Sequence, residues 1–170
     1  MKKQFILLAT IILISLTSLA QDDFTLVKVG DKVPAFSFES SPGVAASIND
    51  YRGKVVVMTF FATWCGPCRA KLPHIERDIY GKYAQGNQVV FLTFGREHDW
   101  DTVLKFRADQ QFKMPFHADS ERKVFALFAA QNIPRNFIVD KQGNIAYASV
   151  GFNQEDFDKM KAEIDRQAAR

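Results

Sequence analysis

Cysteine is scarce in this chain. Its 170 residues include two cysteines, Cys65 and Cys68, and three scattered histidines, His74, His98 and His117. Structural zinc needs four ligands, usually supplied as two pairs, so a zinc site is disfavoured. A purely structural disulfide between Cys65 and Cys68 would close a very short loop and remove little entropy from the unfolded chain. A structural disulfide is therefore disfavoured as strongly as a zinc site.

An excess of charge of one sign is also lacking. The formal net charge is +3, and it falls to +1 when Lys2 and Lys3 at the N-terminus are set aside. Nothing in this balance points to nucleic acid or an anionic surface as a partner. After the first twenty residues no stretch is apolar enough to span a membrane, and the chain contains no internal repeat, low-complexity tract or linker.

The N-terminus has the pattern of an export signal. Lys2 and Lys3 precede an apolar run over residues 5–16, and small residues, Ser18 and Ala20, follow it. We expect a signal peptide over residues 1–20, cleaved before Gln21. The alternative is an uncleaved membrane anchor over residues 5–20, but the run is shorter than the roughly 18 residues of a spanning helix. No cysteine follows the run, so a lipoprotein anchor is not expected.

Residues 21–170 have the length of one domain with a substantial core. Apolar or alternating segments predict strands, and apolar residues at helical spacing predict helices. The expected strands are 34–39, 46–48, 54–61, 88–94, 136–139 and 145–150, with a short extended piece at 114–116. The expected helices are 65–83, 99–111, 121–130 and 154–167. Asp99 and Ser120 are the expected caps of the second and third helices, and Pro73 should kink the first.

This order predicts an α/β fold with a central mixed β-sheet. Strands separated by helices pair in parallel through right-handed crossovers, and the last two strands form an antiparallel hairpin at the edge. Helices are expected on both faces of the sheet. The first two strands form an additional N-terminal hairpin, and sixteen phenylalanines supply an aromatic core.

The chemistry is concentrated in Trp64-Cys65-Gly66-Pro67-Cys68, between a buried strand and a helix. Unpaired N–H groups at a helix start favour a thiolate on Cys65. Cys65 can then attack a disulfide, and Cys68, one turn further in, can resolve the mixed disulfide. Pro67 suits a first helical turn, Gly66 lets a substrate backbone approach, and Trp64 is expected to cover the site. The pattern predicts a thiol–disulfide oxidoreductase.

The chain resembles the exported TlpA/ResA-like thioredoxins, which are relatives of the AhpC/TSA redoxins. The matching segments are 30–36 (GDKVPAF), 51–57 (YRGKVVV), 62–69 (ATWCGPCR), 133–140 (IPRNFIVD) and 143–145 (GNI). The resemblance implies a thioredoxin-like fold with an extra N-terminal β-hairpin and a central helical insertion. It implies Cys65 as nucleophile, Cys68 as resolving thiol and Pro134 as a cis-proline beside them, with no cofactor and no metal. The substrate-binding residues that it implies are Trp64, Gly66, Pro67, Ile133, Pro134 and Arg135.

Three positions depart from the pattern of that family. Thr59 stands where a buried Asp commonly accepts a proton from the resolving thiol, and Lys71 stands where Glu is common. Lys71 is either solvated or an ammonium that favours a nearby thiolate. Arg135 and Asn136 replace two common threonines, and Arg135 either contacts an acidic partner or lies on the surface. The proton acceptor is therefore left open.

The leading functional hypothesis is a periplasmic reductase of protein disulfides, since Gly66-Pro67 is the pair found in thioredoxin, a strong reductant. The resemblance implies clients in cytochrome c maturation or misoxidised proteins in general, a membrane electron donor such as a DsbD/CcdA-like protein, and a monomer. A redoxin-type peroxidase is a weaker alternative, because Met58 and Ala62 replace the Pro and Thr of the peroxide site. Another alternative is a Cu(I) metallochaperone that would use both thiolates and His117.

Overall fold

The computed structural model describes residues 24–170. The signal peptide expected over residues 1–20 lies outside this described part. Within it, no helix is both long enough and apolar enough to cross a lipid bilayer.

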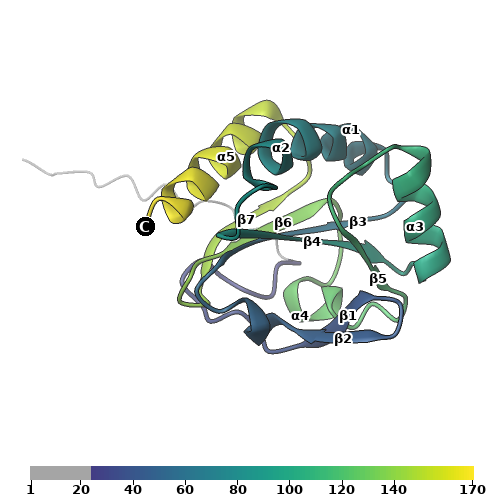
Figure 1. Ribbon diagram of the computed structural model, residues 1–170, viewed down its shortest axis with the longest axis horizontal. Helices are drawn as coiled ribbons and strands as arrows, with labels where there is room; N and C mark the ends of the chain where they lie inside the picture. Colours follow the sequence, from purple (N-terminus) through teal and green to yellow (C-terminus); the bar gives the residue numbers. More distant parts are fainter. Residues whose placement is uncertain (1–23) are drawn as a thin grey trace, which may run out of the picture.

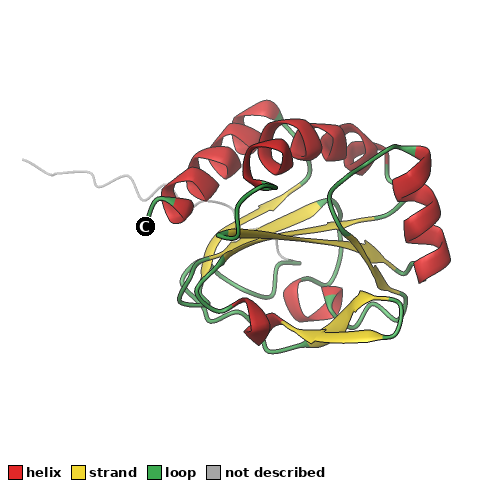
Figure 2. Cartoon of the chain, in the orientation of Figure 1, coloured by secondary structure: helices red, strands yellow, loops and turns green. Residues whose placement is uncertain are grey.

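A five-stranded mixed sheet forms the centre of the fold (Figures 1 and 2). In spatial order its strands are β5 (Phe116–Asp119), β4 (Val89–Arg96), β3 (Val55–Phe61), β6 (Arg135–Val139) and β7 (Ile145–Val150). β3, β4 and β5 are parallel, while β6 runs antiparallel to β3 and β7 antiparallel to β6. The predicted mixed sheet and antiparallel edge are confirmed. Every residue of the central strand β3 is buried, as its unbroken apolar run predicts.

Helices cover one face of this sheet, and a smaller layer covers the other (Figure 1). The first layer contains α1 (Gly66–His74), the π-helical turn η2 (Ile75–Tyr80), α2 (Gly81–Tyr83), α3 (Trp100–Asp109) and α5 (Gln154–Ala168). The second contains α4 (Phe125–Phe128), the hairpin of β1 (Ser37–Ser41) and β2 (Val44–Ser47), and the 3-10 turn η1 (Ile48–Tyr51). The extra N-terminal hairpin is thus confirmed.

Two clusters of aromatic rings hold these layers on the sheet. Phe60 and Phe61 are consecutive on β3 and therefore point to opposite faces. Phe60 contacts the rings of four phenylalanines in the smaller layer's core: Phe94, Phe125, Phe128 and Phe137. Phe61 contacts Phe106 and Phe116 under the helices. Together they fix the end of β3, from which the chain runs directly to Cys65.

Several local predictions needed correction. The expected helix over 121–130 is only α4, and its N–H groups are satisfied by Asp119 instead of Ser120: the Asp119 carboxylate accepts from the backbone of Val124 at 3.0 Å and Phe125 at 2.9 Å. The extended piece at 114–116 is displaced toward the C-terminus, as β5. The predicted cap Asp99 is confirmed, since its side chain accepts from the backbone of Thr102 at 2.9 Å.

The long helix predicted over 65–83 forms as one helical segment of three parts. Pro73 lies inside α1, and the chain changes to π-helical geometry two residues later, at Ile75. Proline removes a backbone donor inside α1, and the π turn, in which bonds span five residues, follows it in the same helical segment.

Candidate active site

The two cysteines form a disulfide at the start of α1, with their Cα atoms 5.2 Å apart. Cys65 is the N-cap residue, and its Sγ accepts a hydrogen bond from the backbone N–H of Cys68 at 3.2 Å. Pro67 lies in the first helical turn, as predicted. Cys65 keeps 5% of its surface exposed, whereas Cys68 is fully buried. A helix N-terminus favours an anion, so this placement stabilises a thiolate on Cys65 once the disulfide is reduced.

The second part of the site comes from the chain entering β6. The Ile133–Pro134 peptide bond is cis, as the family resemblance implied. The carbonyl oxygen of Ile133 lies 3.7 Å from Sγ of Cys65, and the carbonyl of Pro134 accepts from the N–H of Gly151 at 2.8 Å. Segments 68 residues apart in sequence therefore meet at the reactive sulfur.

A groove of about 680 Å³ opens beside Cys65. Four of the predicted site residues line it together with Cys65: Trp64, Gly66, Pro67 and Ile133. Trp64 is 65% exposed and forms part of the wall. The groove is completed by residues that the sequence did not single out, namely Arg96, Arg122, Ala130, Gln131 and Asn132.

Arg135 does not lie where the sequence analysis placed it. Its side chain is 1% exposed, so both the surface position and a direct contact with an acidic partner are wrong. Its Nε donates to the carbonyls of Gln131 at 2.7 Å and Asn132 at 3.1 Å, and its Nη1 donates to the hydroxyl of Thr25 at 2.5 Å. Arg135 therefore braces the loop that carries the cis-proline against the N-terminal arm.

Lys71 is also buried, at 1% exposure, which overturns the solvated alternative. It shares the inward face of α1 with Cys68 and Leu72. Its Nζ donates to the carbonyl of Gly151 at 3.4 Å and lies 6.0 Å from the centre of the Phe152 ring. Loss of water lowers the pKa of Lys71 to about 8, against a smaller opposing effect of Asp156. Lys71 is thus a titratable group on the buried face of α1, the helix that carries the dithiol.

The position of the buried acid of related proteins is filled by a neutral pair. The Thr59 hydroxyl donates to Oδ1 of Asn136 at 3.2 Å, and Nδ2 of Asn136 donates to the Ser149 hydroxyl at 3.3 Å. Thr59 and Asn136 face each other across β3 and β6. Their polar groups satisfy one another, so this pair carries no charge with which to take a proton.

His98 holds the backbone just before the dithiol, a role that the sequence did not indicate. Its Nε2 accepts the backbone N–H of Thr63 at 2.9 Å, while its Nδ1 lies 3.1 Å from the carbonyl of Glu97, to which it donates in that tautomer. Thr63 is two residues before Cys65, so His98 fixes the approach to the dithiol. A Cβ at Gly95 would meet Cγ1 of Val103 at 2.4 Å and Cβ of His98 at 3.1 Å, so only glycine fits at this position. The sequence contains no signal from which the hydrogen bond between His98 and Thr63 could have been predicted.

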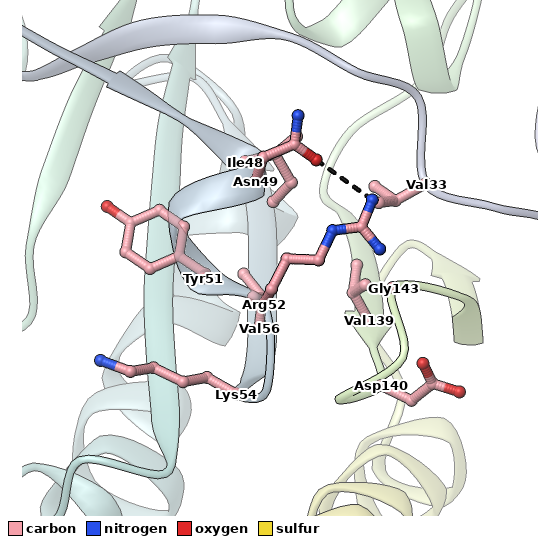
Figure 3. A pocket seen from close by; sticks show the side chains of 10 residues that line it. All are labelled: Val33, Ile48, Asn49, Tyr51, Arg52, Lys54, Val56, Val139, Asp140 and Gly143. Atoms are coloured by element: carbon pink, nitrogen blue, oxygen red, sulfur yellow. Dashed lines mark hydrogen bonds between the residues drawn. The ribbon is translucent and has the colours of Figure 1, made fainter.

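A small cavity at the far end of β3 is structural. It holds about 10 Å³ and is lined by Arg52, Asp140 and Gly143 among others (Figure 3). There Arg52 donates to Oδ1 of Asn49 at 3.3 Å and lies over Gly143. Arg52 and Gly143 belong to the segments 51–57 and 143–145 that carry the family resemblance, so their role here is to pack these two segments together. The cavity has room for about one water molecule at most.

A family comparison agrees with this geometry: residues 28–165 match the redoxin family. The chain belongs to the redoxin family. Within it, the chain is 27% identical over 161 residues to the thiol-disulfide oxidoreductase ResA of Bacillus thuringiensis (strain Al Hakam), covering 89% of this chain and 91% of the relative. It is 29% identical to the thioredoxin-like protein YneN of Bacillus subtilis (strain 168), covering 82% and 81%.

Solved structures show the same relationship. A solution structure from Bacteroides thetaiotaomicron, described as a candidate protein disulfide isomerase, has a TM-score of 0.81 and 28% identity, covering 86% of this chain and 94% of that one. The predicted thioredoxin-like fold and TlpA/ResA-like relationship are confirmed. This redoxin is a thiol–disulfide oxidoreductase with Cys65 and Cys68 as its CxxC pair.

The two alternative functions lack their supporting geometry. His117 packs against Phe38 and Phe94, which belong to the core on the face of the sheet opposite Cys68, so it cannot join the two thiolates around copper. In the described residues no three side chains of His, Cys, Asp or Glu gather at metal-binding distance. Met58, at the position of the peroxide-site proline, is a fully buried core residue.

Proposed function

We propose that this redoxin reduces disulfides of client proteins in the cell envelope, with Cys65 as nucleophile and Cys68 as resolving thiol. The observation that carries the proposal is the asymmetry of the pair. Sγ of Cys65 lies at a helix N-terminus and on an open groove, while Cys68 is fully buried behind it. Only the first sulfur can meet a protein substrate, and only the second is shielded from one.

The reaction proceeds in two exchanges. The Cys65 thiolate attacks one sulfur of the client disulfide, so that the client S–S bond breaks, a client thiolate leaves and a mixed disulfide forms. The Cys68 thiolate then attacks Sγ of Cys65, which releases the second client thiolate and closes the Cys65–Cys68 disulfide. Two electrons pass from the pair to the client, and the released thiolates take up the protons given up by the two thiols.

The groove supplies the client's position. An extended client segment would lie along Ile133 and Pro134, pairing with backbone groups in the manner of an added strand. Gly66, Pro67 and Trp64 would form the opposite wall, where glycine leaves room for the client backbone. The carbonyl of Ile133, 3.7 Å from the Cys65 sulfur, would hold this segment next to the reacting atom.

The cellular setting is part of the proposal. The apolar run over residues 5–16 and the small residues after it support export by a signal peptide over residues 1–20. In the periplasm the closed Cys65–Cys68 disulfide must be reduced again, which requires a membrane dithiol donor such as a DsbD/CcdA-like protein. Clients would be haem-site cysteines in cytochrome c maturation or misoxidised proteins in general, and the protein would act as a monomer.

The deciding experiment is the reduction potential of the Cys65–Cys68 pair, measured by equilibration in glutathione and dithiothreitol buffers. A value near that of thioredoxin, about −270 mV, is expected for a reductase, whereas a value near that of DsbA, about −120 mV, would make the protein a disulfide donor.

The roles of the two sulfurs can be tested separately. Cys68→Ser should accumulate mixed disulfides with client proteins, because the resolving thiol is gone, whereas Cys65→Ser should form none through the buried Cys68. Mass spectrometry of the trapped adducts would identify the client cysteines. Equal trapping by both variants would contradict the assignment.

A further inference from the structure

Two arginines line the groove beside the reactive sulfur, and neither the family pattern nor the proposed chemistry uses them. Arg96 is the last residue of β4, and Arg122 lies in the loop between β5 and α4. Arg96 precedes β5 in the chain and Arg122 follows it, and both line the groove with Cys65, Trp64 and Ile133.

The two guanidinium groups are fixed on the same aromatic ring. The Cζ atom of Arg96 lies 5.3 Å from the centre of the Phe125 ring, and that of Arg122 lies 5.1 Å from it. Cζ of Arg96 also lies 5.7 Å from the centre of the Trp64 ring, and Trp64 is the residue that precedes Cys65 in the sequence. Phe125 is fully buried. Two positive charges are therefore each held against the same buried ring, and both line the groove that contains the nucleophile.

The charges at this place are only partly balanced. Arg96 forms an ion pair with Glu97 at 3.1 Å, but the Glu97 side chain is 47% exposed, so that this pair is weak. Arg122 donates to the carbonyl of Ala130, a neutral group. Asp119 uses both carboxylate oxygens on the N–H groups at the start of α4. Within residues 24–170, Nε of Arg96 and Nε of Arg122 are buried without a hydrogen-bond partner.

The backbone of Arg122 forms a tight turn after β5, in which its N–H donates to the carbonyl of Asp119 at 2.9 Å. Arg122 has a φ of 59°, in the left-handed region that non-glycine residues avoid. The turn fixes the point from which the Arg122 side chain extends toward the groove.

We propose that Arg96 and Arg122 form an anion-recognition subsite that selects client segments with an Asp or Glu close to the reactive cysteine. A guanidinium binds a carboxylate through paired N–H donors, and the neighbouring positive charges favour an anion placed between them. An extended segment rises about 3.3 Å per residue, so the carboxylate would lie within about three residues of the client cysteine. This inference rests on the proposed function, since it concerns the client of the same reaction.

The test compares two disulfide-linked peptides that differ in charge alone, Ala-Glu-Cys-Glu-Ala and Ala-Gln-Cys-Gln-Ala. The second-order rate constant for reduction of each peptide by the reduced full-length protein is measured in stopped flow. Each value is divided by the rate constant with dithiothreitol, a small dithiol without a binding groove that also attacks as a thiolate, to remove differences in the peptides' own reactivity. We expect the Glu peptide to be preferred about five- to tenfold at low salt, the scale of one or two charge pairs in a half-exposed groove.

Variants locate the preference. It should fall to about one in Arg96→Gln/Arg122→Gln, and should persist in the matched control Arg52→Gln/Arg166→Gln, which removes the same charge far from the groove. Glu97→Gln should increase it, because a competing carboxylate is removed. Using the ratio between peptides cancels any change in Cys65 itself. If the double glutamine variant fails to fold, wild-type protein still gives an answer, since the preference should shrink as ionic strength rises from about 20 to about 300 mM.

The outcomes separate the two proposals. Equal rates for the two peptides, or a preference that survives in Arg96→Gln/Arg122→Gln or at high salt, would overturn the anion subsite and leave the reductase intact. If neither peptide is reduced, the proposed reductase function itself fails.

Discussion

Replacing the buried Lys71 by methionine should stabilise the oxidised protein. Loss of water lowers the pKa of Lys71 from its ordinary 10.5 to about 8. This difference corresponds to about 3 kcal/mol, at about 1.4 kcal/mol for each tenfold change in proton affinity. At pH 7 the folded protein bears this cost in full, because Lys71 is protonated and 1% exposed.

The net gain is smaller than that cost. Lys71→Met leaves the carbonyl of Gly151 without the donor at 3.4 Å, a loss of about 1 kcal/mol. The unbranched thioether fills the same space without a charge. We therefore expect Lys71→Met to raise the free energy of unfolding at pH 7 by about 2 kcal/mol.

The pH dependence distinguishes this cause from better packing. Below pH 8, Lys71 is protonated in both the folded and the unfolded state, so the difference between wild type and variant is constant. Between pH 8 and 10.5 the unfolded state binds more protons at Lys71 than the folded state does, and the stability of the wild type rises with pH. The advantage of Lys71→Met should therefore shrink across this window and be lost above it.

Urea unfolding of the oxidised proteins, followed by tryptophan fluorescence at several pH values from 7 to 10.5, measures this difference without titrating thiols. Lys105→Met is the control, because the Lys105 side chain is 77% exposed on α3 and its replacement should change stability by less than about 0.5 kcal/mol. The reasoning would be refuted if Lys71→Met destabilised the protein at pH 7, or if its advantage did not change with pH.

Other buried groups give further predictions. Burial lowers the pKa of His117 to about 4 from 6.5, so the unfolded state binds more protons between these values and stability falls as the pH drops from 6.5 to 4, by up to about 3 kcal/mol; His117→Phe should flatten this acid limb in urea titrations. His98→Ala should slow reduction of a peptide disulfide and destabilise the protein by about 1–3 kcal/mol, since the Thr63 N–H loses its acceptor, and His98→Gln should restore part of the rate. Asp119→Ala should cost about 1–2 kcal/mol in unfolding experiments, because the start of α4 loses its cap.

The sequence predicted those elements whose signal is local. β3 is an unbroken apolar run and is buried along its whole length. Helix α5 has Phe157, Met160 and Ile164 at helical spacing, and all three are buried as expected. The position of the CxxC pair at a helix start followed from the apolar strand before it and from Pro67. Such features depend on residues within a few positions of one another, so pattern reasoning can find them.

Burial of charged side chains was the main failure, and its reason is physical. Lys71 occupies a helical position between Cys68 and Leu72 that faces inward, but the cost of burying an ammonium argued for solvent. The carbonyl of Gly151, which accepts a hydrogen bond from the Lys71 ammonium, is 80 residues away in the sequence. Arg135 is likewise satisfied partly by Thr25, 110 residues away. Only the folded chain brings these acceptors together.

Two other cations, Arg96 and Arg122, bear on the direction of electron flow. Gly66-Pro67 favours a thioredoxin-like reductant, but DsbA is an oxidant because its reduced form is stabilised. Positive groups near a thiolate provide such stabilisation, and here Arg96 and Arg122 line the groove at Cys65. We therefore expect these arginines to raise the reduction potential above the value that the CxxC sequence alone would give. If that is so, the subsite that selects acidic clients also weakens the reductant, and the measured potential reflects the balance between the helix start and the groove.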